Sequence, residues 1–226
     1  MKRNKKVEAA LLVFFGIELI AMLYGYLIDW FGLYHRAENF NFIFYFLLNL
    51  ARCITFIFIF ALLPAQSNAV AKVGALTCSF LYFLYFLNII IIKVSQNYIF
   101  SFMGYYSDIV LDLLFIVGMA MLLFSARIWT PLKVTGFIPV FLSIFITLSR
   151  LGLMKQYVNF DYYDYSKINF LTTMLQIFDV LTILGYLVAT CVAIGAVMRK
   201  SPYETAFIDP PFPPPPPQIP RNPYNY

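Results

Sequence analysis

Five ionisable residues stand inside long apolar stretches of this chain: Glu18, Arg52, Asp112, Arg150 and Asp179. A charged side chain at the centre of a bilayer costs on the order of 3 kcal/mol even on lenient insertion scales, so such residues are rarely incidental. They form ion pairs, or they bind a ligand or a cation. The three acids outnumber the two arginines. At least one carboxylate is therefore expected to be protonated, to bind a cation or to face water.

The apolar stretches define the class of protein. Of the 226 residues, 62% are hydrophobic and 12% are charged, and the mean hydropathy is +0.77. Soluble domains are about half apolar and a quarter charged, so this composition excludes a soluble fold. A helix of roughly 20 residues crosses the hydrocarbon core. Six stretches have about that length and lack the alternation of β-barrel strands: Ala9 to Ile28, Phe40 to Leu63, Val73 to Val94, Asp108 to Ala126, Val134 to Leu153 and Leu171 to Val197.

The sequence therefore predicts an all-α, polytopic membrane protein with a six-helix transmembrane bundle in residues 1–200. Basic residues favour the cytoplasmic side, and their distribution places both termini there in a multi-pass topology. The segments expected inside hold Lys2, Arg3, Lys5, Lys6, Lys72, Arg127, Lys133, Arg199, Lys200 and Arg221. The segments expected outside hold Arg36, Lys93, Lys155 and Lys167, and Arg150, near the outer boundary of its stretch, is counted with them. The net charge of +5 follows from these flanks and calls for no nucleic-acid partner.

Polar residues recur at the helical spacing of three and four, which places them on one face of each helix. The second stretch has Tyr45, Asn49, Arg52 and Thr55. The sixth has the longest series: Thr172, Gln176, Asp179, Thr182, Tyr186 and Thr190. By position along their helices, Glu18, Arg52 and Asp179 are expected to meet near the midplane, while Asp112 and Arg150 form a shallower outer set. The pattern predicts a polar interior, although small and hydroxyl residues also line ordinary helix contacts in membrane bundles.

Motifs for catalysis or metal binding are not found. The chain has no phosphate-binding glycine loop and no nucleophile elbow, so we expect no enzyme activity and no cofactor. The single histidine, His35, has no clustered cysteines, and no metal site is expected. Cys53, Cys78 and Cys191 all fall within predicted spans, where we expect them to be buried apolar residues rather than disulfide partners.

The last 26 residues, 201–226, form a separate module, because ten of the 13 prolines lie there. Proline fixes φ and has no amide donor, so this tail is expected to be a disordered, exposed polyproline segment. Phe212 followed by Pro213, Pro214, Pro215 and Pro216 resembles the FPPPP ligand of EVH1 domains. The resemblance implies a cytosolic partner of the EVH1 type, and the looser proline pattern also suits SH3 or WW domains. A plain disordered spacer is the alternative.

Two functions fit this sequence. The first is binding or passage of a small ligand or cation through a polar interior lined by Glu18, Asn49, Arg52, Asp112, Arg150, Gln176 and Asp179. The alternative is a non-transporting scaffold or receptor-like subunit that recruits cytosolic partners through the tail. With either function, the expected partner of the chain is the lipid bilayer. Self-association into a homo-oligomer is compatible with both functions. The sequence names neither the ligand nor the membrane.

Overall fold

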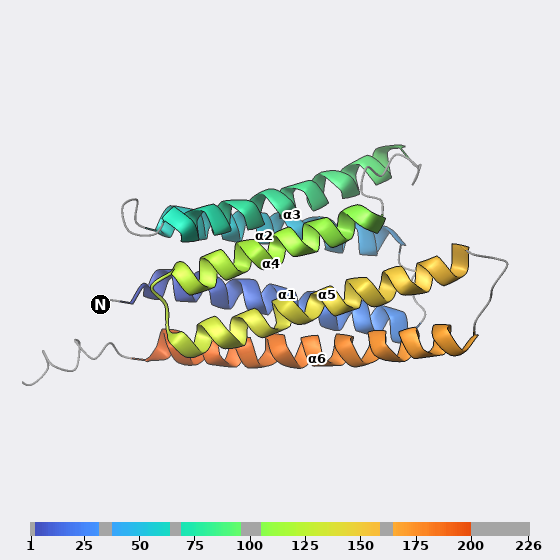
Figure 1. Cartoon of the computed structure of the whole chain (residues 1–226). Helices are drawn as coiled ribbons and strands as arrows, with labels where there is room; N and C mark the ends of the chain where they lie inside the picture. Colours follow the sequence, from blue (N-terminus) through green and yellow to red (C-terminus); the bar gives the residue numbers. More distant parts are fainter. Residues whose placement is uncertain (1–2, 32–37, 64–68, 96–104, 159–164, 200–226) are drawn as a thin grey trace, which may run out of the picture.

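The computed structural model describes residues 3–31, 38–63, 69–95, 105–158 and 165–199, and the described chain is helical. The six helices are α1 (Lys5–Phe31), α2 (Glu38–Leu62), α3 (Ala69–Ser95), α4 (Tyr105–Ser125), α5 (Thr130–Val158) and α6 (Tyr165–Met198). They run antiparallel to their sequence neighbours along one bundle axis (Figure 1). His35 and the Phe212 to Pro216 motif lie outside the described residues.

Each helix coincides with one predicted stretch but is longer. The largest shift of a single boundary is in α6, which begins at Tyr165 rather than at the predicted Leu171. Five helices are long and apolar enough to cross a membrane, and α4 contributes a shorter apolar segment, Ile109–Ser125. Large apolar side chains such as Ile20, Phe58 and Val188 are exposed around the bundle, as a lipid-facing surface requires. The fold therefore indicates a multi-pass integral membrane protein.

The helices form two groups of three that can be followed in Figure 1: α2, α3 and α4 on one side, and α1, α5 and α6 on the other. Contacts are most extensive within the groups, between α5 and α6, α2 and α3, and α3 and α4. Within the first group, the backbones of α3 and α4 come into close contact where the two helices cross. A Cβ atom on Gly74 would lie 2.4 Å from the carbonyl oxygen of Gly118, so only glycine permits this approach.

In the second group, proline and glycine set the contact between α5 and α6. Pro139 lies within α5 and packs on Gly185 of α6, where an added Cβ atom would lie 3.0 Å from Cβ of Pro139. Further along the same pair of helices, Phe145 stacks on Phe178 with ring centroids 4.9 Å apart. These contacts fix which residues of the two helices lie at the same level of the bundle.

The buried core is concentrated at the end of the bundle that holds the first turn of α1 and the last turn of α6. We call this the sealed end. It contains Phe14 and Phe15 of α1, Phe56 and Ile59 of α2, and Leu122 of α4, all of them fully buried. The outer halves of the helices contribute far fewer core residues, and we call that half the open end. The bundle is thus closed at one end and loosely packed at the other.

One prediction about the cysteines is wrong. Cys53 and Cys78 are buried as expected, but Cys191 is exposed on the outside of α6. The inward face of α6 is formed by Thr182, Tyr186, Ala189, Ala193 and Ala196. Cys191 falls between the residues of this face, and helical rotation turns it towards the surroundings of the bundle.

Candidate ligand-binding site

A buried ion pair joins the two groups of helices at mid-height. The Nη2 atom of Arg52 on α2 lies 2.7 Å from Oε2 of Glu18 on α1. The hydroxyl of Tyr82 on α3 donates to the other carboxylate oxygen at 2.9 Å, so both oxygens of Glu18 accept a hydrogen bond. Asn49 accepts a bond from Nη1 of Arg52 at 2.9 Å. This confirms the predicted meeting of Glu18 and Arg52 and adds Tyr82.

Four aromatic rings from four helices lie directly beneath the ion pair, on the side of the sealed end. Phe14 contacts Phe56 at a centroid distance of 4.8 Å, and Tyr82 contacts Phe115 at 5.4 Å. The Arg52 guanidinium lies over the Tyr82 ring at 5.1 Å, close enough for a cation–π contact. The rings form an apolar floor under a charged layer and separate it from the core of the sealed end.

Above this floor is a cavity of about 580 Å³ that is partly open to the outside of the bundle. Ligand pockets in proteins fall in the range of roughly 300–1,000 Å³. Every helix contributes to the wall. Its polar residues are Glu18, Tyr45, Asn49, Arg52, Tyr82, Tyr85, Asp112, Ser143, Thr147, Arg150, Thr182 and Tyr186, and its apolar residues are Met22, Leu81, Phe115, Ile146 and Leu151.

Ser143, Thr147 and Arg150 mark successive turns of α5 along the cavity wall. Ser143 and Arg150 are seven positions apart, which corresponds to about 10 Å of helix. Thr147 donates a short hydrogen bond to Asp112 of α4. Arg150, at the outermost level, is exposed and lies at the mouth. The cavity therefore extends from the ion pair to a guanidinium about two helical turns further out.

Two polar atoms of the wall are buried without a partner among the described residues: Nε of Arg52 and the hydroxyl oxygen of Thr182. Thr182 lies on the inward face of α6 and is 0% exposed. A buried polar group without a hydrogen bond costs roughly 1–3 kcal/mol. Bound water or a ligand atom that reached the wall would remove that cost.

The structure brings together five of the seven residues predicted to line the interior: Glu18, Asn49, Arg52, Asp112 and Arg150. Asp112 lies one helical turn outward from the floor residue Phe115 and bonds to Thr147, and Arg150 lies a further turn out on α5, so both are shallower than the ion pair, as predicted. Both border the same cavity as Glu18.

Gln176 and Asp179 are not among the residues of the cavity wall, and Arg52 is neutralised by Glu18. The polar series on α6 enters the cavity only at Thr182 and Tyr186. Further outward, Gln176 is exposed and Asp179 is half-buried. The spacing identified a continuous polar face, but only its inner part is covered by other helices.

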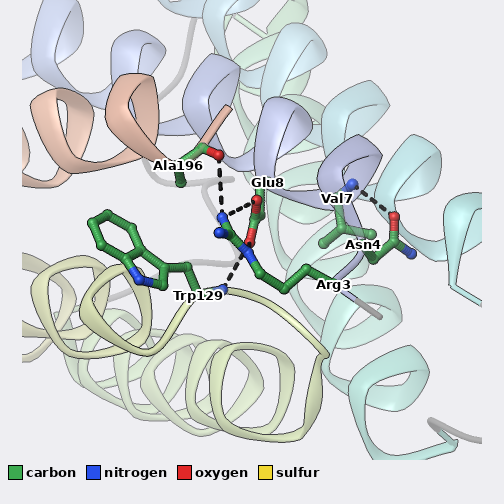
Figure 2. Close-up of polar contacts among 6 residues, drawn as sticks. All are labelled: Arg3, Asn4, Val7, Glu8, Trp129 and Ala196. Atoms are coloured by element: carbon green, nitrogen blue, oxygen red, sulfur yellow. Dashed lines mark hydrogen bonds and ion pairs between the residues drawn. The ribbon is translucent and has the colours of Figure 1, made fainter. Parts of the chain in front are cut away.

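A second buried acid, Glu8, was not predicted as a candidate because the first apolar stretch appeared to begin at Ala9. It is 0% exposed and lies in the sealed end (Figure 2). Arg3 donates two hydrogen bonds to its carboxylate, from Nε at 3.0 Å and from Nη2 at 2.7 Å. The backbone N–H of Trp129 donates a third at 2.7 Å. Every oxygen of Glu8 is thus engaged by protein donors.

Figure 2 shows how this cluster connects the start of α1 to Trp129, just before α5, and to Ala196 of α6. Arg3 also donates to the carbonyl oxygen of Ala196 on α6 at 3.1 Å. Asn4 caps α1 by accepting a bond from the N–H of Val7 at 3.2 Å, and its side chain donates to the carbonyl oxygen of Leu62 on α2. The signal available in the sequence was an acid five residues after Arg3. The bonding partners are distant in sequence, and spacing alone does not identify them.

Comparison with protein-family models, with characterised proteins and with solved structures finds no match to this chain. The chemistry of the site is therefore interpreted from its own geometry.

Proposed function

We propose that this membrane protein binds a small polar or charged ligand in the cavity, which the ligand enters from the open end. The observation that carries the proposal is the Glu18–Arg52 pair at the base of a cavity of about 580 Å³ in the middle of apolar helices. Charged residues at this depth mark ligand or ion paths in membrane bundles. A purely structural pair would not need a cavity above it.

The contrast between the two ends favours binding from one side over a continuous pore. Passage to the other side would require the aromatic floor and the Glu8 cluster to separate. This arrangement suits a receptor, or one state of a carrier that opens alternately to the two sides. Catalysis has no part in the proposal.

We further propose that all six helices cross the membrane and that both termini are cytoplasmic. The asymmetry of Lys and Arg residues supports this orientation, which puts the open end on the outer face. Labelling of single cysteines at Ser67 and Asn97, both in connecting segments, is expected to show opposite sidedness. Finding both positions on one side would contradict six crossings.

Cysteine accessibility tests the cavity directly. Starting from a chain in which Cys53, Cys78 and Cys191 are replaced by alanine, Thr147→Cys and Leu148→Cys form a matched pair. Thr147 lines the cavity, whereas its neighbour Leu148 is 46% exposed towards the apolar surroundings. A membrane-impermeant thiosulfonate added from outside is expected to modify Thr147→Cys and not Leu148→Cys, because water reaches only the cavity. Absence of reaction at Thr147→Cys would refute a water-accessible cavity.

The proline-rich tail supports a second, compatible role. The FPPPP segment at Phe212 suits docking to a polyproline-binding domain, so a receptor could transmit occupancy to a cytosolic partner. A partner that is recruited equally by a chain without residues 201–226 would exclude this role.

A further inference from the structure

We infer that the ligand is a small organic oxyanion, a carboxylate or phosphate with an apolar body, and that Arg150 binds its oxyanion at the mouth of the cavity. The inference rests on the proposed cavity and names the class of ligand that it takes. The choice of an oxyanion follows from which donors and acceptors of the cavity wall already form hydrogen bonds with other protein groups.

The acids of the wall are engaged by protein donors. Glu18 accepts bonds from Arg52 and Tyr82. Asp112 accepts a bond from Thr147. A cationic ligand would have to compete with these donors for the carboxylates, and each bond displaced would have to be replaced. The acids therefore stabilise the cavity wall and are poorly placed to select a cation.

Two buried groups of the wall have no partner among the described residues, and both can donate: Nε of Arg52 can only donate, and the hydroxyl of Thr182 can donate or accept. Arg150 also has no ion-pair partner in the part of the chain that the structure describes. A surplus of donors is complementary to a ligand rich in acceptors.

Arg150 is the group best suited to an oxyanion. Its planar guanidinium matches a carboxylate or phosphate in a bidentate geometry, and hydrogen bonds between charged groups are about twice as strong as neutral ones. It lies at the mouth, where it is exposed, while Arg52 is held by Glu18 and Asn49. An anion would therefore meet Arg150 before it reached the ion pair.

The rest of the cavity suits an apolar body. Phe115, Ile146 and Leu151 line it together with Met22 and Leu81. Small-molecule sites usually combine an apolar lining with a few polar groups that fix orientation. The oxyanion can come from a soluble metabolite or from a lipid, because a guanidinium at the outer level of the bundle can also contact headgroup phosphates.

The test uses the full chain in detergent, with benzoate as the probe. Benzylammonium and benzyl alcohol carry the same ring with a positive charge or no charge. Binding is measured by equilibrium dialysis of labelled ligand and by the shift in unfolding temperature. Benzoate is expected to bind and to raise the unfolding temperature, and benzylammonium is expected to bind at least about tenfold more weakly.

Arg150→Gln is expected to weaken benzoate binding at least about tenfold, since it removes a charge-assisted bond. Arg150→Lys keeps the positive charge but loses the bidentate guanidinium. Its affinity for benzoate is expected to lie between those of the wild type and Arg150→Gln. Lys155→Gln is the matched control, because Lys155 lies further out on α5, is exposed and does not line the cavity. It is expected to bind benzoate like the wild type.

The outcomes separate the ligand class from the cavity itself. If benzylammonium binds as tightly as benzoate and Arg150→Gln changes neither, the cavity remains a binding site but the oxyanion inference is wrong. If Thr147→Cys is also unreactive towards the thiosulfonate, the proposed water-accessible cavity is wrong as well as the oxyanion inference.

The two sources are distinguished by mass spectrometry of lipids retained after purification. A phospholipid or fatty acid that copurifies with wild type and Lys155→Gln but is lost from Arg150→Gln identifies the bilayer as the source. Benzoate binding without such a lipid identifies a soluble anion. Equal lipid retention in all variants, together with equal benzoate binding, overturns the role of Arg150.

Discussion

The sealed end and the middle of the bundle each contain a buried glutamate paired with an arginine, and the surroundings of the two pairs differ. At the sealed end, Glu8 is 0% exposed and accepts bonds from Arg3 and from the backbone of Trp129. At mid-height, Glu18 is 5% exposed, and its partner Arg52 borders the cavity with an unpartnered Nε atom. The first pair is enclosed by bonded neighbours, and the second lines a space. The same pair of residue types is thus enclosed by protein in one place and borders a cavity in the other.

The largest effect is expected for Glu8→Gln. Removing one partner of a buried pair costs about 3–5 kcal/mol, because the remaining charge is left without compensation. The side chain of Arg3 is 25% exposed, so the loss should lie near the lower end. Unfolding of the purified chain in one detergent measures it. Lys6→Gln, an exposed change in the same helical turn, serves as the control. Wild-type stability of Glu8→Gln would show that the cluster does not hold the sealed end.

Gly74→Ala is expected to cost about 1–3 kcal/mol, the usual range for overpacking. The added Cβ atom would lie 2.4 Å from the carbonyl oxygen of Gly118, and two backbones must separate to accommodate it. Gly16→Ala is the matched control, because nothing lies within 4 Å of its added Cβ atom. The same unfolding measurement compares the two. Equal stability of both variants would mean that α3 and α4 do not meet at this crossing.

Glu18→Gln is expected to cost only about 1 kcal/mol, because the amide can still accept a bond from Tyr82 or Arg52 and water can enter from the cavity. The informative quantity is its difference from Glu8→Gln under identical conditions. A loss as large as that of Glu8→Gln would indicate that the mid-height pair is as dry as the sealed end. The distinction between the two pairs would then be wrong.

We predicted from the sequence that residues 201–226 form a solvated polyproline segment. If so, their removal is expected to change the free energy of unfolding by less than about 0.5 kcal/mol, because such a segment would bury no apolar surface of the bundle. The losses of stability caused by Glu8→Gln and by Glu18→Gln should be the same in the truncated chain as in the full chain. Marked destabilisation would show that the tail packs on the helices.

Partner recruitment is measured on the same truncated chain and on Phe212→Ala, by pulldown from cytosol. Recruitment is expected to be lost in the first and weakened in the second, since Phe212 is the bulky anchor of the proline run. Pro217→Ala, which leaves the FPPPP sequence intact, is the control.

The sequence predicted the helices and the level of the ion pair, because apolar length and helical spacing are local properties. The choice of Glu18 over Asp179 as the partner of Arg52 was not predictable. Spacing identifies one polar face on each helix, but it does not determine how each helix is rotated against its neighbours. Gln176 belongs to the predicted series on α6, yet it lies where no other helix covers that face.

Glu8 was missed for a related reason. An acid among flanking lysines at the start of an apolar stretch resembles an ordinary solvated end. Glu8 accepts a bond from Trp129, and its partner Arg3 donates to Ala196; both residues are distant from Glu8 in the sequence and lie near it only in the folded bundle. The sequence predicted a polar interior and five residues of the cavity wall, but not the volume of the cavity or its aromatic floor, since these depend on how the two groups of helices pack.

The length of α6 has a consequence for the shape of the protein in its bilayer. Its 34 residues extend roughly 51 Å, against a hydrocarbon core of roughly 30 Å. Even a tilt of about 40°, the upper end of the usual range, leaves a projection of roughly 39 Å along the membrane normal. The outward end of α6, with exposed Lys167, Asn169 and Thr173, must therefore stand in the headgroup layer or beyond it. At this end α5 and α6 extend further along the bundle axis than α4 (Figure 1), so a solute that enters the cavity as we propose would approach more easily beside α4.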